Sequence, residues 1–131
     1  MVTFWISIIF LFSQDVSSFI HTKKIIENIS NFLSLHFSVS SLNYIIRKGA
    51  HIIEFFILSF LLYSFLGKLD MKKIHMILLA SLFSLNIAFL DEIHQLYVPG
   101  RIGILNDVFI DFIGIFMFLF FILCFNKKAE R

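Results

Sequence analysis

Three long runs of apolar residues constrain this chain more than any other feature of its sequence. They extend from Gly49 to Leu66, from Ile74 to Leu90 and from Val108 to Phe125, and only a few polar residues near one end interrupt each run. A helix that crosses the roughly 30 Å hydrocarbon core of a bilayer needs about 20 mostly apolar residues, and these runs come close to that length. The sequence therefore predicts an all-α integral membrane protein.

Composition supports the same fold class. Hydrophobic residues make up 59% of the 131 positions, and Phe alone occurs 19 times. A soluble domain of this size could not bury so much apolar surface, and large apolar patches facing water would favour aggregation. We therefore expect the lipid bilayer to be the main partner. The net charge of only +2 and the lack of a basic run interleaved with aromatic residues argue against nucleic acid as a partner.

A shorter apolar run, from Val2 to Phe12, begins the sequence and needs its polar continuation toward Ser18 to complete a span. A cleaved signal peptide is the alternative, but no Lys or Arg precedes the run and no small-x-small cleavage site follows it. We expect an uncleaved first helix, and hence a bundle of about four transmembrane helices in one domain, residues 1–131. Apolar residues then recur at helical spacing between Ile25 and Leu33, which predicts an amphipathic helix at the membrane interface.

The distribution of Lys and Arg predicts the orientation, because short basic loops stay on the cytoplasmic side. Three lysines fall in the short segment from Gly67 to Lys73, and three basic residues follow Phe125. With four spans, both termini are then cytoplasmic. Four basic residues oppose this topology, although they lie in a longer segment where the rule is weaker. They are Lys23, Lys24, Arg47 and Lys48.

Most ionisable residues near the spans fall at the ends that this topology places outside. Arg47, His51 and Glu54 are spaced by four and three, so they share one helix face. Asp107 and Asp111 likewise share a face where the fourth span opens. Charges near hydrocarbon are costly and normally face one another or a water-filled cavity, so we expect one outward-facing polar pocket. Its predicted lining is Arg47, Lys48, His51, Glu54, Asp91, Glu92, His94, Gln95, Arg101, Asp107 and Asp111.

Glycine and proline add two local predictions. Pro99 and Gly100 predict a turn between the last two spans, because Pro fixes one φ angle and Gly permits the other. That turn would place Arg101 at the mouth of the pocket. Gly114, one turn below Asp111, has no side chain and would let another helix approach closely.

Three blocks of sequence carry a family resemblance. They read RKGAHIIEF at residues 47–55, DEIHQLYVPGR at residues 91–101 and NDV at residues 106–108, and the upstream stretch FSQD spans residues 12–15. Together they resemble the VanZ-like family, in which a Ser-x-Gln stretch follows the first helix. The motif residues that the resemblance carries over are Arg47, Lys48, His51, Glu54, Asp91, Glu92, Gln95, Pro99, Arg101 and Asp107.

The resemblance has consequences for location and function. It implies a multi-pass protein of the bacterial cytoplasmic membrane, in a family whose named member is linked to resistance to the glycopeptide antibiotic teicoplanin. It implies no particular reaction. Enzymatic activity, cofactor and metal therefore stay unassigned at this point.

Several interpretations of the polar residues stay open. One is an ion-pair network that only pins the helices together. Two histidines and five acids exceed what such a network needs, and desolvating them is costly, so a functional cavity is favoured. A metal site is one form that such a cavity could take, because His51 and Glu54 on one helix would face Asp91, Glu92 and His94 on another.

Two further interpretations of the cavity involve an organic ligand. In the first, Arg47, Lys48 and Arg101 bind an anionic lipid head group, a cell-wall precursor or a glycopeptide through charge-assisted hydrogen bonds. In the second, the protein is a membrane-embedded enzyme that acts on a lipid head group or a lipid-linked cell-wall precursor. Glu54 or His51 would then be its general base.

Overall fold

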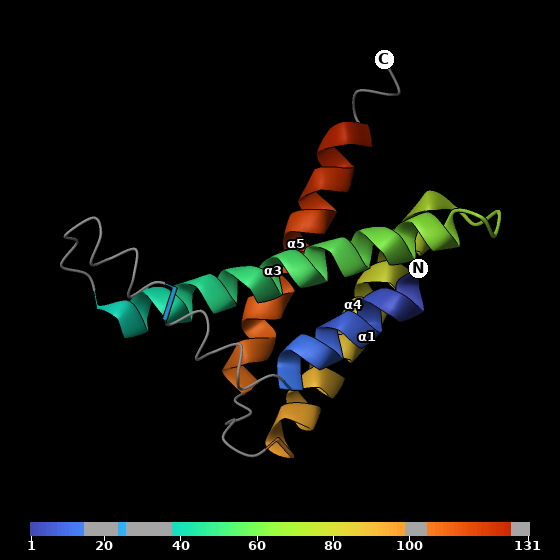
Figure 1. The fold of residues 1–131 in the computed structure, drawn as a ribbon. Helices are drawn as coiled ribbons and strands as arrows, with labels where there is room; N and C mark the ends of the chain where they lie inside the picture. The colour runs from blue at the N-terminus through green and yellow to red at the C-terminus, as the bar shows by residue number, and fades with distance from the viewer. Residues whose placement is uncertain (15–23, 26–37, 99–104, 127–131) are drawn as a thin grey trace.

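The fold is all-helical, as predicted. A computed structural model describes residues 1–14, 24–25, 38–98 and 105–126, and no strand occurs among them. The helices are α1 (Val2–Gln14), α3 (Val39–Leu66), α4 (Lys73–Leu96) and α5 (Leu105–Asn126) (Figure 1). Lys24 and Ile25 are helical, but the rest of the amphipathic helix expected between Ile25 and Leu33 lies outside the described residues.

Among the described residues, three helices are long and apolar enough to cross a membrane, as the three long apolar runs predict. They cover Ser40–Leu66, Lys73–Leu96 and Asp107–Phe125. All three helices exceed the apolar runs that predicted them, α3 and α4 by the most. α3 begins at Val39 instead of Gly49, and α4 continues to Leu96 instead of Leu90. Extending an existing helix adds a hydrogen bond for each residue fixed, so polar residues next to an apolar run readily join its helix.

The first helix is shorter than a full span. α1 has 13 residues, which extend about 20 Å at 1.5 Å per residue, whereas the hydrocarbon core is about 30 Å thick. The continuation toward Ser18 that a complete span requires lies outside the described residues.

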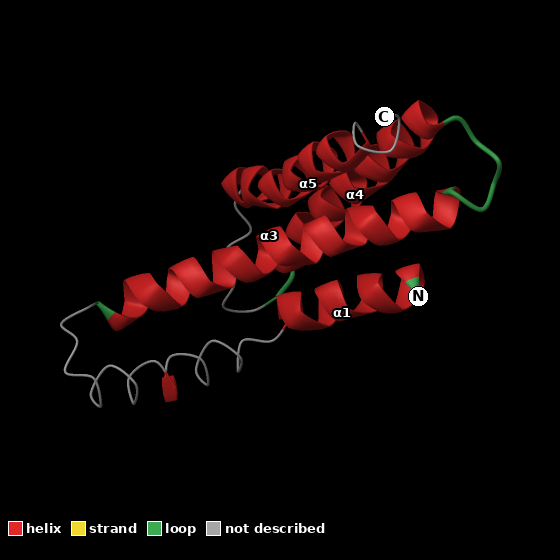
Figure 2. Ribbon diagram, turned by 90° about the horizontal axis from the view of Figure 1, so that it is seen from above, coloured by secondary structure: helices red, strands yellow, loops and turns green. Residues whose placement is uncertain are grey.

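Successive helices run in opposite directions. The indole Nε1 of Trp5 donates a hydrogen bond to the backbone oxygen of Glu54 at 3.1 Å, and Met1 lines a groove together with Lys68. The start of α1 therefore lies beside the end of α3, as both views show (Figure 1, Figure 2). Ile122 near the end of α5 belongs to the same apolar cluster as Leu66, so the end of α5 is at this side as well.

Two apolar clusters fill the bundle. Between them, the hydroxyl of Ser59 donates a hydrogen bond to that of Ser84 at 2.9 Å, which joins α3 to α4 in the interior. The outer surface carries large apolar side chains such as Phe109, Phe116 and Phe120, as expected for a surface that meets lipid. The buried members of the two clusters are Ile9, Phe55, Leu58, Ala88, Val108 and Ile115 in the first, and Leu66, Ile77, Ala80, Phe118 and Ile122 in the second.

Helices α3 and α5 cross in close contact at Gly114, which confirms the prediction for this glycine. A Cβ atom added there would lie 2.2 Å from the backbone oxygen of Ile52 and 3.1 Å from the backbone nitrogen of Phe56. Figure 1 shows α5 crossing α3. The crossing brings the first turns of α5 against the part of α3 that carries His51.

Candidate functional site

A group of ionisable side chains lies inside the bundle, at the end away from Met1 and Lys68. His51 Nδ1 is 3.4 Å from Asp111 Oδ1 on α5 and 3.8 Å from Glu54 Oε2, one turn further along α3. The side chains of His51 and Glu54 are each 17% exposed and that of Asp111 is 3% exposed. The imidazole is thus held between carboxylates from two helices.

Asp91 completes this group from α4. It is fully buried, and Gln95 Nε2 donates a hydrogen bond to its Oδ2 at 2.8 Å. Asp91 also interacts electrostatically with His51, Glu54 and Asp111. Its other oxygen, Oδ1, has no hydrogen-bond partner among the described residues. We call His51, Glu54, Asp91 and Asp111 the polar cluster.

Basic residues of α3 meet the first turn of α5 beside the polar cluster. Lys48 Nζ lies 2.5 Å from Asp107 Oδ2, and Arg47 interacts electrostatically with the same carboxylate. The Lys48 ammonium also lies 5.3 Å from the centroid of the Tyr44 ring, within the range of a cation–π contact. This pair is half-buried, so Asp107 connects α5 to α3 at the rim of the cluster.

The remaining predicted site residues take different positions around the cluster. Glu92 and Gln95 are buried, while His94 is half-buried and packs edge-on against the Phe10 ring of α1, with centroids 5.4 Å apart. Arg101 lies outside the described residues, as does the predicted turn at Pro99. The structure therefore groups His51, Glu54, Asp91 and Asp111, places the contact of Lys48 with Asp107 beside them, and directs His94 toward α1.

Comparison with protein families identifies the chain. A model of the VanZ/LLP1 family matches residues 1–126, a range that contains helices α1, α3, α4 and α5 and the polar cluster. The chain belongs to this family. Comparisons with curated proteins and with solved structures found no match. Membership of this family and the three candidate spans found in the described part of the chain indicate a multi-pass membrane protein.

Three residues that the structure buries or bonds were not among the predicted site residues. Ser13 at the end of α1 and Asn43 near the start of α3 are both buried, and Trp5 bonds to the backbone of Glu54. A signal was present for Asn43, because it precedes Arg47 by four residues and so shares a face with it. Ser13 belongs to the stretch that carries the family resemblance.

No metal site emerges from the part of the chain that the structure describes. It contains no group of three or more His, Cys, Asp or Glu side chains arranged to hold an ion. The metal interpretation thus gains no geometric support from these residues. His51 instead lies within ion-pair distance of two carboxylates, where an imidazole can accept or donate a proton, although its Nδ1 forms no hydrogen bond among the described residues.

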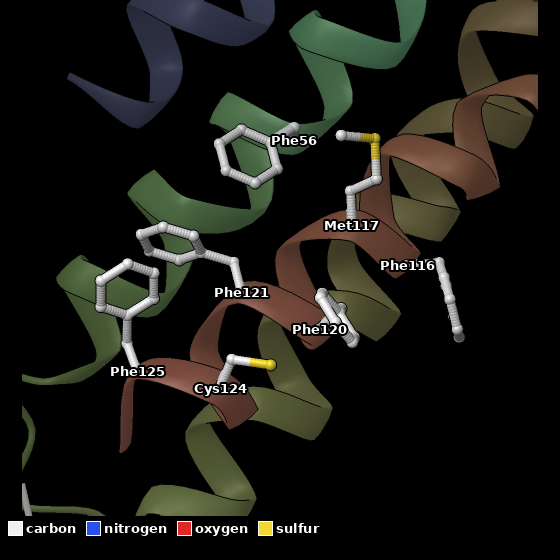
Figure 3. Close-up of a pocket in the computed structure, with 7 residues that line it drawn as sticks. All are labelled: Phe56, Phe116, Met117, Phe120, Phe121, Cys124 and Phe125. Atoms are coloured by element: carbon white, nitrogen blue, oxygen red, sulfur yellow. The ribbon is translucent and has the colours of Figure 1, made fainter. Parts of the chain in front are cut away.

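Two grooves of the VanZ/LLP1 protein lie away from the polar cluster. One runs between α1 and the end of α3, past Met1 and Lys68. The other, on the outer side of α5, is entirely apolar, as expected where a helix pair meets lipid (Figure 3). Neither contains a residue of the polar cluster, so an open polar pocket at the cluster stays a prediction. The residues of the apolar groove are Phe56, Phe116, Met117, Phe120, Phe121, Cys124 and Phe125.

Proposed function

We propose that this VanZ/LLP1 protein acts at the outer face of the bacterial cytoplasmic membrane, where its polar cluster recognises a component of the cell envelope. Through that interaction it would alter sensitivity to glycopeptides such as teicoplanin. The observation that carries the proposal is the fully buried Asp91, which has one oxygen without a hydrogen bond from the described residues. Ionisable groups inside a span are costly and typically serve function.

The balance of charge supports a working site over a structural ion-pair network. Glu54, Asp91 and Asp111 all interact with one imidazole, His51, and Lys48 interacts in addition with Asp111. Moving charged groups out of water costs free energy, and this cost is offset only when each charge is well paired. A network that merely held the helices together would be expected to match its charges more evenly.

The ligand class that fits the site is an anionic lipid head group, a cell-wall precursor or the glycopeptide itself. Arg47 and Lys48 lie at the rim of the cluster, and both interact with Asp107. Guanidinium and ammonium groups bind phosphate and carboxylate through charge-assisted hydrogen bonds. The rim would hold the anionic part of such a ligand, while the polar cluster would meet its uncharged or cationic polar groups.

The orientation of this proposal follows from the positive-inside rule. Met1, the lysine-rich segment Gly67 to Lys73 and the end of α5 share one end of the bundle, and the polar cluster lies at the other. Basic short loops stay cytoplasmic. We infer that both termini are cytoplasmic and that the cluster faces outward.

Isosteric substitutions test whether the polar cluster has a function beyond stabilising the fold. In a strain that depends on this gene for its teicoplanin phenotype, we expect Glu54→Gln and Asp111→Asn to abolish the phenotype while expression and melting temperature stay near wild type. Asp70→Asn is the matched control. Asp70 is exposed in the α3–α4 loop with a φ of 49°, a conformation that Asn adopts readily. Loss of the phenotype only together with loss of folding would support the ion-pair network.

A membrane-embedded enzyme that acts on a lipid head group or lipid-linked cell-wall precursor is the second candidate. The proximity of His51 to Asp111 favours it, because a nearby carboxylate stabilises a protonated imidazole and so makes the imidazole a stronger general base. The test is to incubate the purified protein in vesicles with a lipid-linked cell-wall precursor and to follow products by mass spectrometry. Turnover that disappears in His51→Gln would support the enzyme, and binding without turnover would support recognition alone.

A further inference from the structure

Asn86 is a polar residue on the lipid-facing side of a transmembrane helix. It lies near the middle of α4 (Lys73–Leu96) and is exposed. Two residues before and after it, Ser84 and Ala88 are fully buried, so Asn86 points away from the bundle. The buried face of α4 consists of Ile77, Ala80, Ser84, Ala88, Asp91, Glu92 and Gln95.

The amide of Asn86 is only partly satisfied within the described residues. Its Nδ2 donates a hydrogen bond to the backbone oxygen of Leu82 at 2.8 Å, and the described part of the chain supplies no other partner for the side chain. An amide has two N–H donors and an acceptor oxygen, so one donor and the oxygen are left over. Exposed Ser7 and Ser64 differ, because each donates its single proton to a carbonyl of its own helix.

Lipid hydrocarbon cannot form hydrogen bonds with the remaining polar atoms of Asn86. Water can satisfy an exposed amide near the ends of a span, but not at the middle of the bilayer. Polar side chains at such positions commonly form hydrogen bonds across helix interfaces. A partner for the Asn86 amide must therefore present an apolar surface that carries a hydrogen-bond donor and an acceptor at the same depth in the bilayer.

The neighbours of Asn86 form a seam suited to packing against another helix. The residues Leu82, Asn86, Phe89, Ile93 and Leu96 are spaced by four, three, four and three, and all are exposed. This spacing is that of helices that pair with a left-handed crossing. A polar residue within such a seam fixes the register of the pair.

We propose that the protein associates with a second copy of itself through this face of α4, with the two Asn86 side chains hydrogen-bonded to each other across a two-fold axis. In a two-fold interface a residue on the axis meets its own counterpart. An amide is self-complementary, because each can donate an N–H to the oxygen of the other. The polar cluster faces the opposite side of α4, so each copy keeps its own site.

Cross-linking in the bilayer tests this interface in the full chain. In a Cys124→Ser background reconstituted in vesicles, Leu82→Cys should form a disulfide-linked dimer on oxidation, while Met117→Cys on the exposed face of α5 should not. Adding Asn86→Leu should weaken association by about 3- to 30-fold, the range expected for hydrogen bonds between transmembrane helices. Asn86→Gln should retain most of it. Dissociation constants from fluorescence energy transfer at varied protein-to-lipid ratios measure the change.

Several outcomes would overturn the proposal. The proposal fails if the protein is monomeric at all protein-to-lipid ratios, or if Asn86→Leu leaves the dissociation constant unchanged. Equal cross-linking at Leu82→Cys and Met117→Cys would show contact by random collision. Melting temperature serves as the check on folding. Because Asn86 makes no contact with the bundle interior, Asn86→Leu should melt no lower than wild type when the protein is diluted to the monomer.

Discussion

Gly114 on α5 packs directly against the backbone of Ile52 on α3, so closely that a Cβ atom on Gly114 would lie 2.2 Å from the Ile52 carbonyl oxygen. The obstacle is backbone, which cannot move aside as a flexible side chain can. The contact sets the distance between α3 and α5, and with it the separation of His51 from Asp111.

Gly114→Ala should therefore destabilise the bundle. We expect the cost of overpacking to be roughly 1–3 kcal/mol, seen as a lower melting temperature in detergent. Gly49→Ala is the matched control on α3, because an added Cβ there meets no atom within 4 Å. Replacing a helical Gly with Ala should leave stability unchanged or raise it by up to about 1 kcal/mol. Equal melting of the two variants would contradict the close crossing.

The contact between Lys48 and Asp107 should be measurable as a coupling energy. Their side chains are 18% and 23% exposed, so solvent screening is reduced but still present. A double-mutant cycle with Lys48→Gln and Asp107→Asn should give a coupling of roughly 0.5–1 kcal/mol. Lys68→Gln paired with Asp107→Asn is the control, because these residues lie at opposite ends of the bundle and their effects should add. Additivity in both cycles would show that the pair contributes nothing.

Trp5 should attach α1 to the helix that carries Glu54. Trp5→Phe keeps an aromatic ring but removes the hydrogen bond to the Glu54 carbonyl, so we expect a loss of about 0.5–1.5 kcal/mol in detergent unfolding. Phe4→Leu, at an exposed neighbouring position, should have little effect. Trp5 is the only tryptophan, so its fluorescence reports on this contact alone. Emission typical of a water-exposed indole in the folded wild type would argue against docking of α1.

Membrane orientation can be decided by labelling. In a background without Cys124, a thiol probe that cannot cross the membrane should modify a cysteine placed at Gly103 and leave one placed at Lys72 unmodified in intact cells. Both should react after permeabilisation, which controls for accessibility. The reverse pattern would place the polar cluster on the cytoplasmic side and remove the basis for an action on the outer envelope.

The helix boundaries show where reading the sequence falls short. Apolar runs locate a membrane span well, because each apolar residue placed in lipid lowers the free energy of the inserted helix. They do not tell where the helix ends. α4 continues past Leu90 to Leu96, because the polar residues that follow the run face the bundle interior, where Asp91 bonds to Gln95. That environment exists only once α3 and α5 are in place.

The sequence by itself determined the all-helical membrane fold, the family and the residue types of the candidate site. Those properties depend on local composition, on spacing along one helix and on short motifs. Only the tertiary structure decided that His51 lies between Glu54 and Asp111, that His94 turns toward α1, and that Asn86 faces outward. These relations depend on how far each helix is rotated and where two helices cross, which in this protein is set by the backbone contact of Gly114 with Ile52.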